Sequence, residues 1–205
     1  MPSLRTGEDD RRMFEVERKR ELPDAAVFRQ RLDALGYRES SSHTEVDTCY
    51  SRPDIDFMAT VECLRVRRRE GFAEVTYKPP SDAAAHSPDD VITKQEINVE
   101  LADADQAGAA DALLRAVGMV ELVRVEKART TYRHPDAEDP VVSIDVVTGV
   151  GAFIETEVTA VDSDAAAERL RGAERALDAS DYPPVRLPYR DLVLAAREAA
   201  STTGG

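Results

Sequence analysis

Charged side chains of the same sign recur two residues apart along several segments of the chain. These pairs are Glu15 with Glu17, Arg65 with Arg67, Lys127 with Arg129, and Glu155 with Glu157. In an extended strand, residues two apart share a face and lie roughly 6–7 Å from one another. Like charges that close destabilise a fold unless opposite charge lies between them. The spacing therefore indicates faces that bind charged ligands, with carboxylates suited to Mg²⁺ or Mn²⁺ and with Lys and Arg suited to phosphate.

The same alternation is also typical of ordinary amphipathic strands, whose charges face water while their apolar side packs on helices. The pattern alone leaves this alternative open. Two observations favour a binding face, namely the same-sign pairs and the number of strands. About eight antiparallel strands can close into a barrel whose interior holds one small ligand.

Strands are expected wherever the alternation of period two is found, and helices between a capping residue and a glycine stop. The expected strands cover 14–22, 43–51, 61–70, 72–80, 93–101, 121–133, 141–149 and 151–160, and the expected helices 23–36, 103–118, 164–177 and 191–200. In the first helix, Val27, Leu32 and Leu35 form the expected buried stripe. The count predicts an α+β fold that is mainly antiparallel.

We therefore predict a closed, eight-stranded β-barrel with helices packed outside and with charged side chains lining its lumen. A single domain is expected over residues 13–200, with a flexible lead at 1–12, a mobile loop at 79–91 and a flexible tail at 201–205.

Composition narrows the class of partner. The net charge of −13 over 205 residues argues against a nucleic-acid partner, because binding along nucleic acid needs a basic face. No stretch approaches the roughly 20 apolar residues of a membrane span. Cys49 and Cys63 belong to no Cys-x-x-Cys motif, so we expect packing residues in a reducing cytoplasm. The expected partner is a small molecule, and whether the chain forms a homodimer stays open.

Five segments, in this order, resemble the motifs of the CYTH superfamily, also called the triphosphate tunnel metalloenzymes. They are Glu15-Val16-Glu17-Arg18-Lys19, Leu64-Arg65-Val66-Arg67, Thr76-Tyr77-Lys78, Val125-Glu126-Lys127-Ala128-Arg129, and Asp145 followed by Gly151, Phe153, Glu155 and Glu157. The resemblance runs from about residue 13 to residue 195. Residues 45–50 and 186–192 also resemble segments of the class IV adenylyl cyclases. Glu45, Cys49 and Pro188 depart from that pattern, which leaves the substrate open.

The resemblance implies a metal-dependent enzyme that binds a triphosphate inside the barrel, with Mg²⁺ or Mn²⁺ as cofactor and two ions expected. It implies Glu15, Glu17, Asp145, Glu155 and Glu157 as metal ligands. The residues that it implies as phosphate-binding are Lys19, Arg65, Arg67, Lys78, Lys127, Arg129 and Arg186. Among these two sets, Lys19, Arg65, Lys78 and Glu157 are the expected catalytic residues. Glu96 and Glu100 are further candidates on the acidic side.

Three functions remain open. A class IV adenylyl cyclase would convert ATP to cyclic AMP and pyrophosphate. A triphosphatase would hydrolyse thiamine triphosphate, inorganic triphosphate or another phosphorylated metabolite. A non-catalytic protein would bind polyphosphate or nucleotide without turnover. One constellation serves both reactions, because they differ in which phosphorus is presented for attack.

Overall fold

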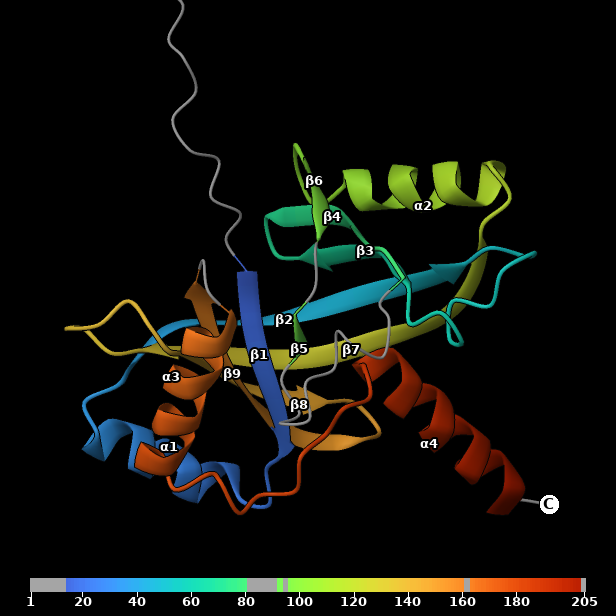
Figure 1. The fold of residues 1–205 in the computed structure, drawn as a ribbon. Coiled ribbons are helices and arrows are strands. Elements are labelled where there is room, and N and C mark those ends of the chain that lie inside the picture. The colour runs from blue at the N-terminus through green and yellow to red at the C-terminus, as the bar shows by residue number, and fades with distance from the viewer. Residues whose placement is uncertain (1–13, 81–91, 94–95, 161–162, 204–205) are drawn as a thin grey trace, which may run out of the picture.

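The computed structural model describes residues 14–80, 92–93, 96–160 and 163–203. Its elements follow the predicted order closely (Figure 1). The strands are β1 (Phe14–Glu21), β2 (Arg38–Ser51), β3 (Cys63–Arg69), β4 (Phe72–Lys78), β5 (Ile92–Thr93), β6 (Ile97–Leu101), β7 (Val120–Arg133), β8 (Val141–Val147) and β9 (Gly151–Ala160). The helices are α1 (Ala25–Ala34), α2 (Gln106–Ala116), α3 (Ser163–Ala176) and α4 (Tyr189–Thr203). The predicted lead and most of the predicted loop at 79–91 lie outside these residues.

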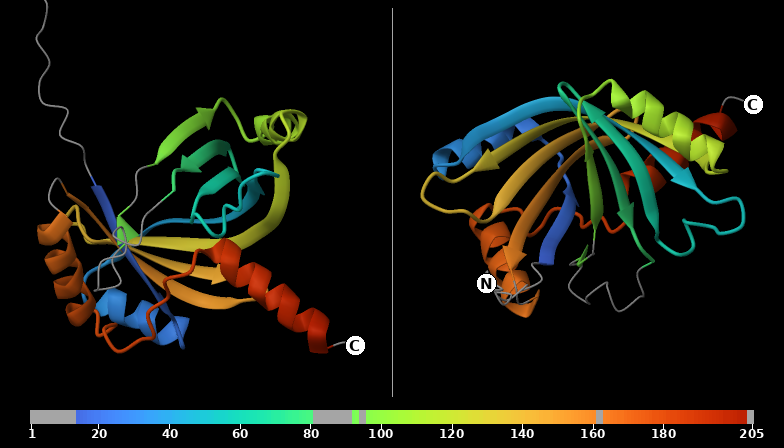
Figure 2. Two further views of the ribbon diagram at one scale, coloured as in Figure 1. Left: turned by 45° about the vertical axis from the view of Figure 1, so that its right-hand side comes forward. Right: turned by 90° about the horizontal axis from the view of Figure 1, so that it is seen from above.

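The strands form one antiparallel sheet of nine strands in the order β5-β1-β9-β8-β7-β2-β3-β4-β6. The sheet is strongly curved (Figure 2). Its concave side holds the charged stripes. The prediction of a closed, eight-stranded barrel is wrong. Within the described residues, the order is linear, and no backbone ladder joins its two ends. The protein is α+β, with an open trough instead of a closed barrel.

The trough stays open because the strand that would have to close it is divided. A closing strand must pair with β1 on one side and with β4 on the other. Residues 92–93 pair only with β1, opposite Glu17 and Val16, whereas residues 97–101 pair only with β4. Among the described residues, neither β5 nor β6 therefore pairs with both β1 and β4.

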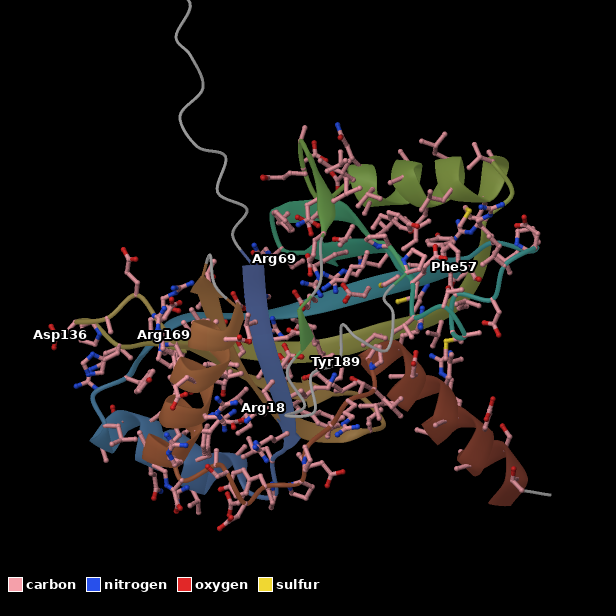
Figure 3. All side chains as sticks on the ribbon, in the orientation of Figure 1. Arg18, Phe57, Arg69, Asp136, Arg169 and Tyr189 are labelled. Carbon is pink, nitrogen blue, oxygen red and sulfur yellow. The ribbon has the colours of Figure 1, made fainter. Side chains whose placement is uncertain are left out.

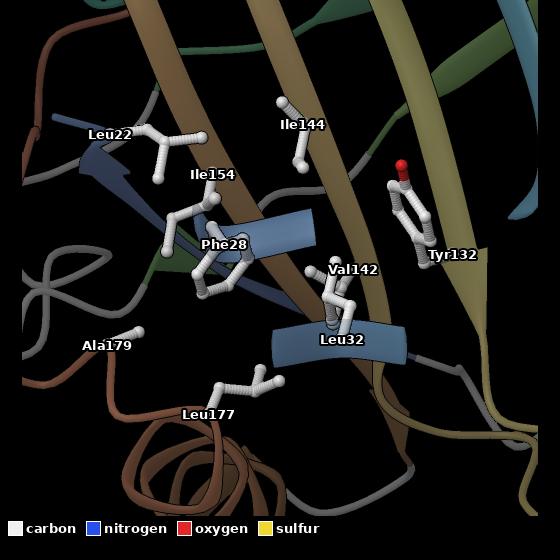
Figure 4. Close-up of a cluster of buried hydrophobic side chains, with 9 residues drawn as sticks. All are labelled: Leu22, Phe28, Leu32, Tyr132, Val142, Ile144, Ile154, Leu177 and Ala179. Carbon is white, nitrogen blue, oxygen red and sulfur yellow. The ribbon is translucent and has the colours of Figure 1, made fainter. Parts of the chain in front are cut away.

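Helix α1 packs against the convex face of β8 and β9, where it builds the largest buried cluster (Figure 4). Asp24 caps the helix, since its carboxylate accepts hydrogen bonds from the backbone N–H groups of Ala26 and Val27 at 2.9 and 3.0 Å. The buried stripe consists of Phe28 and Leu32. The predicted stripe is wrong at its ends, because Val27 is 47% and Leu35 40% exposed.

Two more helices cover the convex face. Helix α3 packs Ala166 and Leu170 against Val16 and Val158 of β1 and β9. Its buried Glu174 carboxylate accepts hydrogen bonds from Arg18 and Arg20, which ties α3 to the outer side of β1 (Figure 3). Helix α2 covers β3 and β4 through a cluster that includes Tyr50, Val66 and Ala107. None of the described helices is long and apolar enough to cross a membrane.

Helix α4 departs from the prediction that all helices pack outside. Its first turns contact Val125, Val147 and Phe153, which share the concave face with the charged residues further along the same strands. Together with the segment before it, α4 fills one end of the trough with apolar side chains. This end is therefore apolar, and the charged part of the trough begins where Tyr189 lies (Figure 3).

Candidate active site

The concave face encloses a pocket with a volume of about 270 Å³. Strands from both halves of the sheet contribute to it, because the curvature brings β1 and β9 to face β3 and β4. The charged residues that line it are Glu17, Lys19, Glu62, Arg65, Arg67, Glu74, Lys78, Glu96, Lys127, Arg129, Glu155, Glu157 and Arg186. Val61, Cys63, Pro188 and Tyr189 complete the lining. The structure thus gathers nearly all the predicted charges on one surface.

Arg67 is held against the floor of the trough by Asp47. The Asp47 carboxylate accepts hydrogen bonds from Nε and Nη2 of Arg67, both at 2.7 Å, and Arg65 lies at 3.5 Å. Burial alone would raise the pKa of Asp47, but Arg67 and Arg65 outweigh it and hold that pKa well below the usual range. Asp47 therefore stays ionised and fixes the orientation of a predicted phosphate-binding residue.

Arg129 and Lys127 share Asp145. Its carboxylate is 0% exposed and accepts hydrogen bonds from Nε and Nη2 of Arg129 at 2.7 and 2.6 Å and from Lys127 Nζ at 3.3 Å. Arg129 also contacts Glu155. Burial would raise the pKa of Glu155, but Arg129 and Lys127 lower it below its usual range. These two predicted metal ligands, Asp145 and Glu155, are thus neutralised by cations of the protein itself.

Glu45 completes this network and was not among the predicted site residues. It is 2% exposed, with Oε1 at 2.9 Å from Lys127 Nζ and 3.2 Å from Arg67 Nη2. Lys127 and Arg67 overcome the opposing effect of burial and lower the pKa of Glu45. The signal was available in the sequence, because Glu45 precedes Asp47 by two residues and so shares its face.

Lys19 is buried beside Tyr189, the first residue of α4 (Figure 3). Its Nζ lies 4.1 Å from the centre of the Tyr189 ring, and Lys127 Nζ lies 4.9 Å from the same centre. Two ammonium groups this near an aromatic ring are stabilised by its electron density. Burial lowers the pKa of Lys19, an effect that Glu155 and Glu17 oppose. Tyr189 therefore holds two predicted phosphate-binding lysines side by side at the apolar end of the trough.

Glu17 and Glu157 stand directly opposite each other on β1 and β9. Within the described residues, neither has a cationic side chain within 4 Å. Burial, together with Glu17 and Glu155, raises the pKa of Glu157. Two adjacent carboxylates in a half-buried site repel each other, and a bound cation or a proton would relieve that repulsion. Glu15 lies on the same face of β1, opposite Thr159, but its side chain is outside the described part of the structure.

Lys78, Glu96 and Arg186 also line the pocket. Lys78 forms an ion pair with Glu96. Burial alone would lower the pKa of Lys78, but the negative charges of Glu17 and Glu96 outweigh burial and raise it. Arg186 lines the pocket from the segment that precedes α4. Glu100 does not line the pocket; it pairs with Glu74 across β6 and β4.

The donor set fits one hard cation bound together with its ligand. No group of three or more His, Cys, Asp or Glu side chains among the described residues is arranged to hold a metal by itself. Mg²⁺ is usually bound through one or two carboxylates plus water and substrate phosphates. The pair of Glu17 and Glu157 meets this requirement, whereas Asp145 and Glu155 are engaged by Arg129 and Lys127.

The sequence model of the CYTH domain family matches residues 13–180. The chain belongs to the CYTH domain family. A Methanocaldococcus jannaschii protein named as a putative adenylate cyclase is 30% identical over 183 residues, which cover 88% of this chain and 98% of that protein.

Solved structures share the fold of this CYTH protein. A Pyrococcus horikoshii protein is 26% identical with a TM-score of 0.72, over 88% of this chain and 98% of its own. A Hippeastrum protein is 18% identical with a TM-score of 0.65, over 90% and 96%. Its structure is described as that of a putative adenylyl cyclase with a dominant triphosphatase activity.

The structure identifies ion pairs and lining residues of the pocket that the sequence motifs did not indicate. The sequence motifs did not identify Glu45, Glu62, Glu74 or Cys63 as lining or supporting residues. Glu62 had no signal in the sequence, since it lies in the connection before β3, where the backbone turns through a positive φ of 56° at Val61. Buried Arg190 holds this connection, because its Nη1 donates to the Glu62 carbonyl at 2.6 Å.

Proposed function

We propose that this CYTH protein is a divalent-metal-dependent enzyme that acts on a small molecule bearing a triphosphate. The observation that carries the proposal is the separation of charge within one pocket. Cations fixed by buried carboxylates line the β2, β3 and β7 side, whereas Glu17 and Glu157 face each other across β1 and β9 and form no ion pair among the described residues. A triphosphate with its metal neutralises both sides at once.

The proposed roles follow from these positions. Arg65, Arg67, Lys127 and Arg129 bind phosphate oxygens, and their buried partners keep them oriented before the substrate arrives. Lys19 and Lys78 approach the phosphate chain from the two sheet halves, and Arg186 approaches it from the segment before α4.

Glu17 and Glu157 would hold Mg²⁺ or Mn²⁺, which when bound neutralises phosphate oxygens and favours attack on phosphorus. Because little covalent chemistry is needed, positioning and charge account for catalysis. The two carboxylates, on adjacent strands, would set where along the phosphate chain the cation sits.

The first candidate reaction is that of a class IV adenylyl cyclase, in which ATP gives cyclic AMP and pyrophosphate. It is supported by the name of the M. jannaschii relative and by the resemblance of residues 45–50 and 186–192. Within the first of these segments, Asp47 orients Arg67, while Tyr50 lies on the opposite face and donates to Asp111 at 2.7 Å. This segment therefore supports the phosphate side of the pocket rather than a nucleoside.

The second candidate is a triphosphatase, in which water attacks the terminal phosphorus. The size and lining of the pocket favour it. About 270 Å³ lies below the usual 300–1,000 Å³ of ligand pockets, and the apolar part of the lining is small. Such a pocket suits a phosphate chain better than a large organic group. The activity described for the Hippeastrum protein agrees with this candidate.

The test is to incubate the purified chain with ATP, thiamine triphosphate or inorganic triphosphate, each with Mg²⁺, Mn²⁺ or EDTA, and to resolve the products. Cyclic AMP and pyrophosphate would identify a cyclase, and orthophosphate without a cyclic product would identify a triphosphatase. Glu17→Gln and Glu157→Gln should each abolish metal-dependent turnover.

Glu126→Gln is the matched control, because Glu126 is an exposed carboxylate on the opposite face of β7 and should leave turnover unchanged. Full activity of both site variants would refute the proposed metal site. Tight triphosphate binding without turnover of any substrate would refute the enzyme and leave a binding protein.

A further inference from the structure

We propose that Cys63, in the wall of the trough, is oxidised by hydroperoxides, and that Cys49 then converts the oxidised sulfur to a disulfide. The inference goes beyond the proposed function, and its thiol measurements do not depend on turnover of a triphosphate.

The two cysteines of the chain lie next to each other in space. Cys49 of β2 is directly opposite Arg65 of β3, so Cys63 is its diagonal neighbour on the same face. Diagonal side chains on adjacent antiparallel strands are within reach of each other. Both are free thiols, and the side chain of Cys49 interacts with that of Cys63. A disulfide joins Cβ atoms that are about 3.5–4.5 Å apart, which is closer than diagonal neighbours of a regular sheet and therefore needs a small backbone adjustment.

The backbone at this point can adjust to the shorter sulfur–sulfur distance. Cys63 is the first residue of β3, and the ladder between β2 and β3 ends at the next pair, Tyr50 with Leu64. A small shift of Cys63 towards Cys49 therefore breaks no ladder pair between β2 and β3, and on its other side Cys63 forms only the end pair of the ladder with β4, opposite Lys78.

Their surroundings divide the roles between the two thiols. Cys63 is half-buried and lines the pocket, whereas Cys49 is 3% exposed, so an oxidant meets Cys63 first. The hydrogen bond from Cys49, assisted by Arg65 and Lys78 against the effect of burial, lowers the pKa of the Cys63 thiol to about 6. The same hydrogen bond and burial raise the pKa of Cys49 well above its usual value. Cys63 is thus the more acidic thiol of the pair and the one that reacts first with an oxidant.

The chemistry balances with a hydroperoxide as the oxidant. Cys63 Sγ attacks one peroxide oxygen, the O–O bond breaks, and hydroxide or alkoxide leaves, which forms a sulfenic acid on Cys63. Cys49 Sγ then attacks Cys63 Sγ, the S–O bond breaks, and the leaving oxygen departs as water with the Cys49 proton. The two sulfurs lose two electrons in total, which the peroxide takes up.

The test treats the reduced full-length chain with hydrogen peroxide, then denatures it, alkylates it with iodoacetamide and measures its intact mass. The expected result for the wild type is a loss of two hydrogen atoms and no alkylation, with both thiols recovered after dithiothreitol. Cys49→Ser should instead leave a sulfenic acid on Cys63 that dimedone captures. Cys63→Ser should consume the remaining thiol at least roughly tenfold more slowly than the wild type. Circular dichroism checks that both variants fold.

A second measurement follows iodoacetamide alkylation of the folded protein against pH. The wild-type rate should have its midpoint near pH 6. Cys49→Ala, which removes the hydrogen-bond donor, should move that midpoint upward, whereas Cys49→Ser should move it less. The inference is overturned if both wild-type thiols remain alkylatable at a peroxide dose that oxidises free glutathione. It is equally overturned if the disulfide forms only between chains, or if Cys63→Ser loses its thiol as fast as the wild type.

Discussion

Replacing Asp145 by Asn should destabilise the protein by about 2–3 kcal/mol. The carboxylate is 0% exposed and accepts two hydrogen bonds from Arg129, at 2.7 and 2.6 Å, and one from Lys127 at 3.3 Å. Removing one partner of a buried ion pair usually costs about 3–5 kcal/mol. The loss of stability is smaller here because each cation retains another ion pair: Arg129 with Glu155, and Lys127 with Glu45 at 2.9 Å. The side-chain oxygen of the new Asn can also still accept a hydrogen bond.

Urea denaturation and thermal melting measure this change. For a chain of this length, about 2–3 kcal/mol corresponds to a fall in Tm of roughly 5–10 °C. Asp136→Asn is the matched control, since Asp136 is exposed on the connection between β7 and β8 and should change stability by less than about 0.5 kcal/mol (Figure 3). Inorganic triphosphate should recover part of the stability of Asp145→Asn, because it supplies negative charge to Arg129 and Lys127.

The same variant separates two roles for Asp145. If Asp145 orients cations, Asp145→Asn should bind Mn²⁺ as the wild type does, whereas Glu157→Gln should bind it at least roughly tenfold more weakly. Titration followed by electron paramagnetic resonance measures both. An Asp145→Asn protein as stable as the wild type that no longer binds Mn²⁺ would refute the reasoning, since Asp145 would then be a metal ligand.

Three further predictions concern stability. Burial alone would raise the pKa values of Asp47 and Glu155, but neighbouring arginines lower them, so their contribution is complete above about pH 4.5 and is lost as the pH falls further. Urea denaturation between pH 3 and 7 should show this loss, with a flatter slope in Asp47→Asn. Gly36→Ala should lower the free energy of unfolding by about 1–3 kcal/mol, because φ at Gly36 is +88° and the new Cβ would lie 2.9 Å from His134 Nε2. An unchanged midpoint of urea denaturation would contradict this prediction. Glu174→Gln should lower Tm, because it leaves the buried side chains of Arg18 and Arg20 without their carboxylate partner. Its Mn²⁺ affinity should equal that of the wild type, and a weaker affinity would show that α3 influences the metal site.

The alternation of residues predicted much of this arrangement, because a period of two decides which side chains share a face. Lys19, Arg67 and Glu157 are far apart in the sequence, yet each lies on the concave side, as their positions in their strands require. The helix ends were equally readable. Gly36 and Gly118 have φ values of +88° and +92°, which suit glycine at the end of a helix.

Other features depend on contacts that no local pattern encodes. Whether the sheet closes depends on residues 92–101, which alternate like a single strand but are divided between two partners. The position of α4 was missed for a related reason. Its apolar residues fit either side of the sheet, and only the apolar ends of β7 and β9 on the concave side decide between them.

The pairing of charges changes how the trough can bind an anion. Arg67 and Arg129 are already paired with buried carboxylates, so their charge alone attracts a phosphate only weakly. A phosphate binds to them mainly through the N–H groups that the carboxylates leave free. The carboxylates keep both guanidinium groups in place and reduce the repulsion between them. Glu17 and Glu157 form no comparable ion pair among the described residues, and a cation or a proton would relieve their mutual repulsion. Anion binding and cation binding in this trough should therefore be strongly coupled, each being weak alone and tight together.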